Sequence, residues 1–378
     1  MRHAARLAGQ DIIDLGMGNP DQPPPQHVID KLCEVAAKPD AHGYSQSKGI
    51  PGLRRAQAGY YARRFGVDLD PETEVVVTMG SKEGLASLAT AIVAPGDVVL
   101  APNPSYPIHT FGFIFAGATI RSVPTTPDEH YWESLERAMS FTVPRPSVLV
   151  VSYPSNPTAE TVELPFYERL VAWAKENQVW IISDLAYSEL YFDGKPTPSI
   201  MQVPGAKDVA VEFTSMSKTY SMAGWRMGFA VGNKQLIAAL TRVKSYLDYG
   251  AFTPVQAAAC AALNGPQDII ETNRELYHRR RDVLVEAFGR AGWDIPPPPA
   301  SMFAWAPLPP ALKSMGSLEF SKQLLTQAHV AVAPGVGYGE NGEGYVRIAM
   351  VENEQRLRQA ARNIKRYLQS VGVNSSAA

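Results

Sequence analysis

The sequence predicts an α/β protein in which helices cover both faces of a mostly parallel sheet. In the middle of the chain, short apolar runs alternate with amphipathic, alanine-rich segments, which is the pattern of repeated β-α units. The chain has 378 residues, whereas single domains usually contain about 100–200 residues. We therefore expect a large α/β domain together with a second, smaller domain.

Five apolar runs are predicted as strands because each is short, rich in β-formers and followed by turn residues. They are residues 74–80, 97–103, 147–154, 179–187 and 208–217. Residues 81–93 and 166–177 have the i, i+3, i+4 apolar spacing of helices. In such sheets ligands bind at the carboxyl ends of the strands, so we expect the chemistry in the residues that follow them.

The character of the sequence changes after about Thr253. A helical stretch at 274–293 is followed by a proline-rich segment. Residues 318–371 then predict a helix, a short strand, a glycine-rich loop, another strand and a final amphipathic helix. This part is the expected second domain.

Composition argues for a protein that binds a small ligand. The formal net charge of −2 provides no general attraction for nucleic acid or anionic lipid. Cys33 and Cys260 are too few for a disulfide framework and have no histidines at metal-ligand spacing. No apolar stretch approaches the ~18 residues of a membrane span. We expect an unexported, cytoplasmic protein with no metal site and with no nucleic-acid or membrane partner.

Lys218 is the first candidate for chemistry. It follows a predicted strand that ends in small hydroxyl residues, and a glycine-rich turn with Arg226 comes after it. In a crowded pocket the amine would have a lowered pKa and would be nucleophilic, as Schiff-base formation requires. Ser215, Ser217 and Arg226 could then bind a phosphate. A surface lysine before a turn explains the pattern equally well.

Asp184 is the second candidate. It ends a near-continuous apolar run, which is typical of a central buried strand. A buried carboxylate needs a partner, and a protonated pyridine nitrogen would be one that turns the ring into an electron sink. An N-cap aspartate is the simpler explanation of the isolated residue. Tyr187 could reach the same ligand or could pack in the core.

Three weaker signals follow other strands. Gly80, Ser81 and Lys82 lie in a strand-to-helix turn, where free N–H groups and the helix dipole favour a phosphate. Tyr106, in a proline-rich loop, could stack on a flat ring or cover the core. Asn156 could bond a phenolic or carboxylate oxygen or could mark a plain turn. Together, the candidates describe a site for a flat, phosphorylated, nitrogen-containing aldehyde.

The same motifs carry a resemblance to a known family. Asn156-Pro157-Thr158, Asp184-x-x-Tyr187, Ser215-x-Ser217-Lys218 and Gly224-x-Arg226 resemble the class I/II aminotransferases, which have PLP fold type I. The resemblance covers nearly the whole chain. It implies a large domain at 41–274 with a mostly parallel seven-stranded sheet, and a smaller α+β domain formed by 1–40 and 275–378. It also implies pyridoxal 5'-phosphate (PLP) as cofactor, amino acids and 2-oxo acids as substrates, and a homodimer with shared active sites.

The resemblance assigns a role to each cofactor residue. Lys218 would hold the cofactor as a Schiff base and shuttle a proton, and Asp184 would pair with the pyridine nitrogen. Asn156 and Tyr187 would bond the ring oxygen, and Tyr106 would stack on the ring. The residues that match the family's phosphate binders are Ser81, Lys82, Ser215 and Arg226, and we expect Gly80 to bind the cofactor beside them.

Three more residues are implied in binding outside the cofactor ring. Arg347 matches the arginine that grips the substrate α-carboxylate, a task that suits its forked guanidinium, although a surface strand arginine is the alternative. Gly18 matches a backbone contact near that carboxylate. Tyr44 matches a tyrosine that reaches the phosphate in the neighbouring subunit.

Within the family, several segments are most similar to bacterial alanine aminotransferases, near the LL-diaminopimelate branch. We therefore expect a ping-pong reaction of L-alanine with 2-oxoglutarate. The alternatives are an LL-diaminopimelate, methionine, aspartate or aromatic donor, or a PLP-dependent β-eliminating lyase. Members usually have a longer segment before the one at 11–21, so either part of the pocket lid or dimer arm is missing here or the start codon is misassigned.

Overall fold

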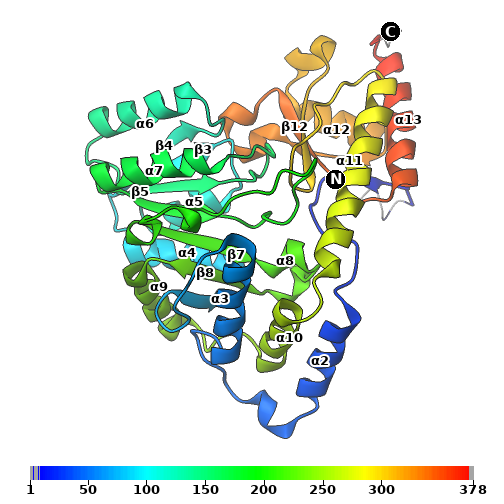
Figure 1. The fold of residues 1–378 in the computed structure, drawn as a ribbon. Coiled ribbons are helices and arrows are strands. Elements are labelled where there is room, and N and C mark those ends of the chain that lie inside the picture. The colour runs from blue at the N-terminus through cyan, green and yellow to red at the C-terminus, as the bar shows by residue number, and fades with distance from the viewer. Residues whose placement is uncertain (1–2, 4–6, 8, 374–378) are drawn as a thin grey trace.

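The computed structural model describes residues 3, 7 and 9–373. It consists of a seven-stranded sheet with helices on both faces and a smaller part built on a three-stranded antiparallel sheet (Figure 1). The α/β fold expected from the sequence is confirmed.

The strand order of the large sheet is β2-β8-β7-β6-β5-β3-β4. Strand β8 is antiparallel to both of its neighbours, and all the other pairs are parallel. The strands are β2 (Val75–Thr78), β3 (Val98–Asn103), β4 (Thr119–Pro124), β5 (Val148–Ser152), β6 (Trp180–Asp184), β7 (Ala210–Ser215) and β8 (Gly228–Gly232). Because two reversals restore the direction, β2 and the parallel strands all end at the same edge of the sheet.

All five predicted strands are present, as β2, β3, β5, β6 and β7. The apolar pattern did not identify β4 and β8. Both predicted helices are confirmed as α4 (Ser81–Ile92) and α7 (Leu164–Asn177).

The other helices lie before, between and after these elements. They are α2 (Gln26–Ala36), α3 (Pro51–Phe65), α5 (Ile108–Phe115), α6 (Glu129–Phe141), α8 (Met216–Thr219), α9 (Lys234–Leu247), α10 (Thr253–Asn264), α11 (Asp268–Arg290), α12 (Ser317–Gln327) and α13 (Glu354–Ser370).

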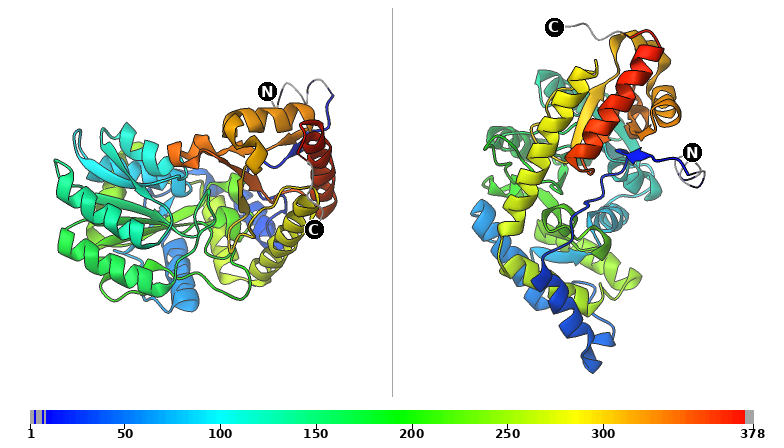
Figure 2. Two further views of the ribbon diagram at one scale, coloured as in Figure 1. Left: turned by 90° about the horizontal axis from the view of Figure 1, so that it is seen from above. Right: turned by 90° about the vertical axis from the view of Figure 1, so that its right-hand side faces the viewer.

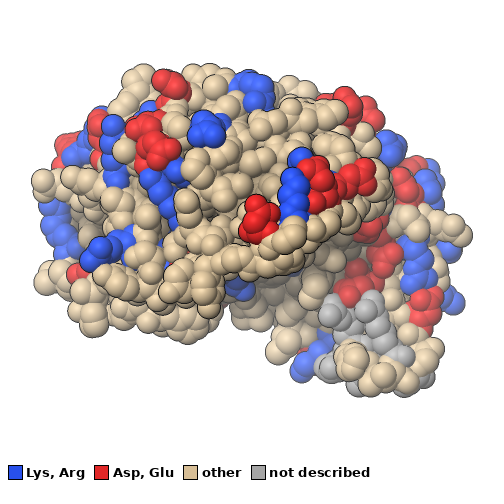
Figure 3. Space-filling model, turned by 90° about the horizontal axis from the view of Figure 1, so that it is seen from below, with Lys and Arg blue, Asp and Glu red and all other residues tan. Residues whose placement is uncertain are grey.

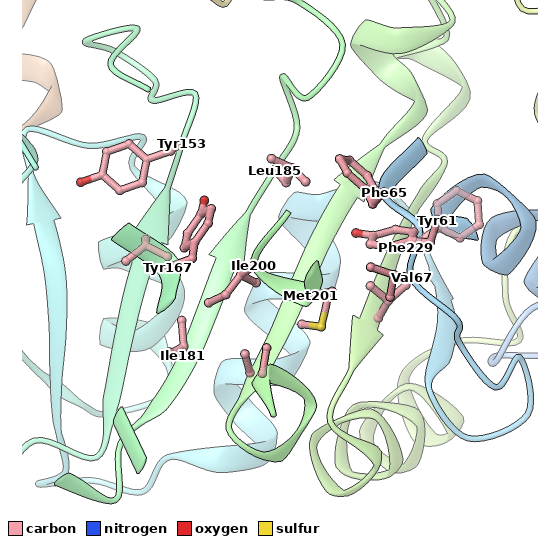
Figure 4. Close-up of a cluster of buried hydrophobic side chains, with 14 of the residues drawn as sticks. Tyr61, Phe65, Val67, Tyr153, Tyr167, Ile181, Leu185, Ile200, Met201 and Phe229 are labelled. Atoms are coloured by element: carbon pink, nitrogen blue, oxygen red, sulfur yellow. The ribbon is translucent and has the colours of Figure 1, made fainter. Parts of the chain in front are cut away.

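Consecutive residues of the central strands are buried on opposite faces of the sheet. In β5, Leu149 and Val151 belong to one buried cluster, whereas Val148 and Val150 belong to the other. Figure 4 shows part of the first cluster, where Tyr61 of α3 lies beside the strands. Since both faces are buried, the strands have continuous apolar runs instead of an alternating pattern.

The smaller part contains the antiparallel sheet β11-β12-β9, formed by β11 (Ala333–Pro334), β12 (Tyr345–Ala349) and β9 (Phe303–Pro307). Strand β1 (Ile13–Asp14) pairs in parallel with β10 (Val330–Ala331). The N-terminal segment therefore joins the C-terminal part, and α11 lies beside α13 on the same side (Figure 2).

We propose the division into residues 41–274 and residues 1–40 with 275–378 as the domain organisation. Helix α11 runs through the boundary at 274, and α2 packs against α10 of the large part. The two parts are therefore joined by a continuous helix as well as by the N-terminal segment.

Lysines and arginines are interspersed with acidic residues on the face that Figure 3 shows. No single-sign stripe crosses that face. Within the described part of the chain, no helix is both long enough and apolar enough to span a membrane.

Gly84 determines how closely α4 approaches the sheet. A Cβ at this position would lie 2.7 Å from Phe213 Cε1 and 2.7 Å from Thr78 Cγ2. We expect Gly84→Ala to lower the free energy of unfolding by about 1–3 kcal/mol, because the helix must move away from the sheet. The midpoint of urea unfolding measures this change.

Gly112, in α5, is the matched control because a Cβ there would meet its nearest neighbour at 3.5 Å. Gly112→Ala should leave stability unchanged or raise it by up to about 1 kcal/mol, since alanine favours the helix. Equal loss of stability in the two variants would contradict this account of α4.

Candidate active site

A cavity of about 290 Å³ lies at the edge where the strands of the large sheet end. Strand β6 ends at Asp184, β7 ends at Ser215, and α8 follows β7 and lies against α11 (Figure 1). Most of the residues predicted for the site line this cavity: Gly18, Ser81, Lys82, Tyr106, Asn156, Asp184, Tyr187, Ser215, Lys218, Arg226 and Arg347. The structure thus brings together side chains that are up to 329 positions apart in the sequence, from Gly18 to Arg347.

Two hydrogen bonds fix the position of the Asp184 carboxylate, which lines the cavity. It is only 6% exposed, and its Oδ2 lies 2.8 Å from His109 Nε2, which donates to it. Its Oδ1 accepts a hydrogen bond from Ala186 N. Turns follow Asp184, so the alternative of a helix N-cap is wrong.

His109 was not among the residues predicted for the site. Its ring is fully buried in α5, and its Nδ1 has no hydrogen-bond partner in the described part of the chain. The residue lies one helical turn after Tyr106, and the two rings meet edge to face with centroids 6.0 Å apart. That spacing is the one signal in the sequence that could have linked His109 to the site.

Lys218 extends from α8 into the cavity and donates a hydrogen bond to Gly18 O. Burial lowers the pKa of its amine to about 8, and the positive charges of Arg347 and Arg226 add to the effect. The alternative of a surface lysine is therefore wrong. The lowered pKa increases the fraction of neutral, nucleophilic amine near neutral pH, as the sequence suggested.

The turn between β2 and α4 is shaped to fit a guanidinium group. Gly80 has a left-handed φ of 82°, and a Cβ there would lie 2.1 Å from Arg226 Nη2. Arg226 is held by Ala223 O at 2.9 Å and Met79 O at 3.4 Å. On the other side, a Cβ at Gly228 would lie 2.8 Å from Ser81 N. A side chain at Gly80 would displace the Arg226 guanidinium, and one at Gly228 would displace the backbone at Ser81.

Hydroxyl groups and a second cation surround the same turn. Ser81 donates to Thr214 O at 3.2 Å, and Ser215 Oγ accepts from Ser217 N at 3.1 Å. Lys82 Nζ lies 5.6 Å from the centre of the Tyr106 ring. With the free N–H groups at the start of α4, these side chains form a concentrated anion-binding surface.

Arg347, in β12, is a buried cation with no carboxylate partner among the described residues. Its guanidinium donates to Asn156 Oδ1 at 2.7 Å and to Gly16 O at 3.1 Å. The rings of Phe303 and Tyr338 lie 3.9 Å and 4.8 Å from its Cζ. Burial lowers its pKa. The alternative of a surface strand arginine is wrong, and a buried unpaired guanidinium favours a bound anion.

Tyr187 is buried beside Phe303, with ring centroids 5.7 Å apart, and burial raises the pKa of its hydroxyl.

Two predicted residues do not line the cavity. Gly80 lies behind Arg226, and Tyr44 is 87% exposed and stacks on Tyr249 at 4.4 Å. The aromatic pair around Arg347 was not predicted, because nothing local in the sequence distinguishes those rings from core residues.

The chain matches the model of "Aminotransferase class I and II" over residues 10–364. It is 65% identical over 370 residues to the putative aminotransferase AatC of Rhizobium meliloti, which covers 98% of this chain and 91% of the relative. This chain belongs to the class I and II aminotransferases.

Two further relatives of this aminotransferase bear more specific names. Glutamate-pyruvate aminotransferase AlaC of Escherichia coli is 53% identical over 373 residues, with 99% of this chain and 90% of AlaC covered. LL-diaminopimelate aminotransferase of Moorella thermoacetica is 42% identical, with 97% and 93% covered. The solved structure of substrate-bound BacF from Bacillus subtilis superimposes with a TM-score of 0.89 at 36% identity, covering 96% and 92%.

Class I and II aminotransferases use PLP, and the cavity of this aminotransferase fits that cofactor. The glycine-lined turn and its cations suit a phosphate, and the Asp184 carboxylate suits a protonated ring nitrogen. The Lys218 amine with its lowered pKa suits an aldehyde. All three lie on one cavity, as a single flat cofactor requires.

The lowered pKa of Lys218 predicts unusual reactivity in the apoprotein. With a pKa of about 8 in place of 10.5, the neutral amine is roughly 300-fold more abundant near pH 7. Because the pKa is lowered, half of the amine is neutral at about pH 8, and the neutral fraction levels off above about pH 9. An ordinary lysine amine would continue to gain reactivity beyond about pH 10.4.

Competitive labelling with acetic anhydride, followed by peptide mass spectrometry from pH 6 to 11, measures this profile. Exposed lysines in the same sample provide the internal reference. A Lys218 profile that keeps rising above about pH 9.5 would contradict the lowered pKa.

Proposed function

We propose that this aminotransferase transfers the amino group of L-alanine to 2-oxoglutarate by a ping-pong mechanism. The observation that carries the proposal is the 53% identity to a glutamate-pyruvate aminotransferase across 99% of the chain. Transfer of the amino group from L-alanine to 2-oxoglutarate yields pyruvate and glutamate. The exchange named for AlaC and the proposed reaction are therefore the same reversible reaction, written in opposite directions.

The lining of the cavity supports a donor with a short, uncharged side chain. Among the described residues that line it, Asp184 is the one carboxylate, and it is hydrogen-bonded to His109. A distal ammonium, as in LL-diaminopimelate, would find no other acidic partner there. Apolar side chains such as Met17, Ile108 and Phe303 line the cavity instead.

The cofactor residues are proposed to act as the resemblance implies. When bound, PLP supplies an electron sink for negative charge at the substrate Cα. Asp184 would pair with the ring nitrogen, and His109 holds that carboxylate in place. Tyr106 would stack on the ring, and Asn156 and Tyr187 would bond its oxygen. Ser81, Lys82, Ser215 and Arg226 would bind the phosphate, and Gly80 shapes the turn behind Arg226.

Arg347 is proposed to bind the substrate α-carboxylate with its forked donors, assisted by the backbone at Gly18. Phe303 and Tyr338 keep the guanidinium in one plane. Lys218 Nζ would then accept the proton that leaves the substrate Cα and hold it for return. Burial lowers the pKa of the free amine to about 8, so part of it is neutral near pH 7 and able to accept a proton.

We further propose a cytoplasmic homodimer in which Tyr44 reaches the phosphate of the partner's site. Large apolar side chains are exposed around this residue, which favours a covered surface. They are Tyr44, Tyr246, Leu247, Tyr249 and Phe252.

A panel of amino donors tests the substrate proposal. With 2-oxoglutarate as acceptor, kcat/KM for L-alanine should exceed that for LL-diaminopimelate by at least about ten-fold, since an unpaired ammonium in the cavity costs more than that. Aspartate, methionine and an aromatic donor complete the panel. A better donor among the others would replace alanine. Steady release of ammonia and pyruvate without any acceptor would indicate β-elimination instead.

Replacement of the Lys218 amine tests the mechanism. We expect Lys218→Ala to lower multiple-turnover kcat by at least about 10³-fold, because a general acid-base group is lost together with the cofactor attachment. Coupled assay of pyruvate formation measures the rate. Lys195→Ala, which removes an exposed lysine, is the control and should be unaffected. Unimpaired turnover of Lys218→Ala would rule out this mechanism.

A further inference from the structure

A buried lysine lies behind the turn between β2 and α4, residues 79–82, which is the phosphate-binding turn of the proposed function. This lysine has no part in the proposed amino transfer. Lys244, in α9, is 0% exposed, and its Nζ lies 2.9 Å from Asp248 Oδ2. The same Nζ lies 3.2 Å and 3.3 Å from the two oxygens of Glu83. A buried ammonium is stable only if its hydrogen bonds to both carboxylates are well formed. Lys244 can therefore hold Glu83 and Asp248 in fixed positions.

Glu83 connects this buried group to the turn that carries Gly80. Its Oε2 accepts a hydrogen bond from Met79 N at 2.8 Å, and its Oε1 accepts one from Ser87 Oγ at 2.8 Å. Met79 directly precedes Gly80, and its carbonyl oxygen accepts from Arg226. The Glu83 carboxylate therefore fixes the backbone on which the anion-binding surface is built.

Asp248 anchors the other side of Lys244. Its Oδ1 accepts from Gly250 N at 2.7 Å, and its backbone oxygen accepts from the Ser47 hydroxyl. A Cβ at Gly250 would lie 2.1 Å from Gln46 O, so the two chain segments are in close backbone contact. Lys244 thus bridges a fixed backbone contact and the phosphate-binding turn.

The charges explain why a cation is needed at this point. Glu83 lies in the first turn of α4, where a negative charge interacts favourably with the helix dipole. A phosphate bound at the same end would be repelled by that carboxylate. Lys244 offsets the charge of Glu83, and the N–H groups of Ser81 and Lys82 remain available for an anion.

We propose that Glu83 and Lys244 are positioning residues for the PLP phosphate. They act through the backbone of Met79 and Gly80 and touch neither the cofactor ring nor the substrate. The proposal rests on the proposed function, which places the phosphate at this turn and at Arg226.

The test compares two ligands of the apoprotein, PLP and pyridoxal, which lacks the phosphate. Glu83→Ala should raise the Kd for PLP about ten-fold, the effect of one hydrogen bond to a charged group, and the Kd for pyridoxal less than about two-fold. Glu83→Gln keeps an acceptor for Met79 N and should stay within about three-fold of wild type for both. Equilibrium dialysis measures each Kd without any turnover.

A second variant and a control complete the design. Lys244→Gln removes the positive charge but keeps a hydrogen-bond donor of similar size. It should also raise the Kd for PLP more than the Kd for pyridoxal. This variant provides the test if Glu83→Ala does not fold. Glu74→Ala removes an ion pair with Lys207 at the other end of β2 and should leave both Kd values unchanged.

The outcomes separate this proposal from the proposed function. If the wild-type apoprotein binds PLP no better than pyridoxal, the placement of the phosphate itself fails. If the wild type prefers PLP but Glu83→Ala and Lys244→Gln keep the same PLP-to-pyridoxal ratio, only the positioning role is overturned. Equal weakening of both ligands would likewise overturn it.

Discussion

The parallel pairing of β6 and β7 is the constraint on which the active site depends. Asp184 ends one strand and pairs in register with Phe213 of the other, and Lys218 follows five residues later on α8. Because neighbouring parallel strands end at one edge, the carboxylate and the amine face the same cavity. An antiparallel pairing would have sent Lys218 to the opposite edge of the sheet.

The cavity also depends on contacts between the large sheet and the smaller part. Arg347 of β12 donates to Asn156 after β5, and Lys218 donates to Gly18 of the N-terminal segment. These two hydrogen bonds join the large α/β part to the smaller part, and each part has its own cluster of buried apolar side chains. The residues proposed to bind substrate and cofactor are therefore held together at a boundary, where small relative movements change the spacing between Arg347 and the Lys218 amine.

Much of the fold could be predicted because both faces of the sheet are buried, which makes the central strands continuously apolar. Strand β4 lacks such a run because most of its side chains are exposed or half-buried. Strand β8 has glycine at both ends, which shortens its apolar run to residues 229–231. Asp184 and Lys218 were recognised from local motifs. His109, Phe303 and Tyr338 act through contacts with distant residues, which one sequence cannot reveal. Tyr44 depends on a second subunit and remains a prediction.

The two buried cations suggest how substrate binding could change the base. The charge of Arg347 contributes to the lowered pKa of Lys218, second only to burial. A substrate carboxylate bound to Arg347 would neutralise that charge and so raise the proton affinity of the amine. The Lys218 amine would then be a weaker base in the empty site than in the site with substrate bound, where the Cα proton is within reach. Arg347 has no carboxylate partner among the residues that the structure describes, and this is what makes such coupling physically possible.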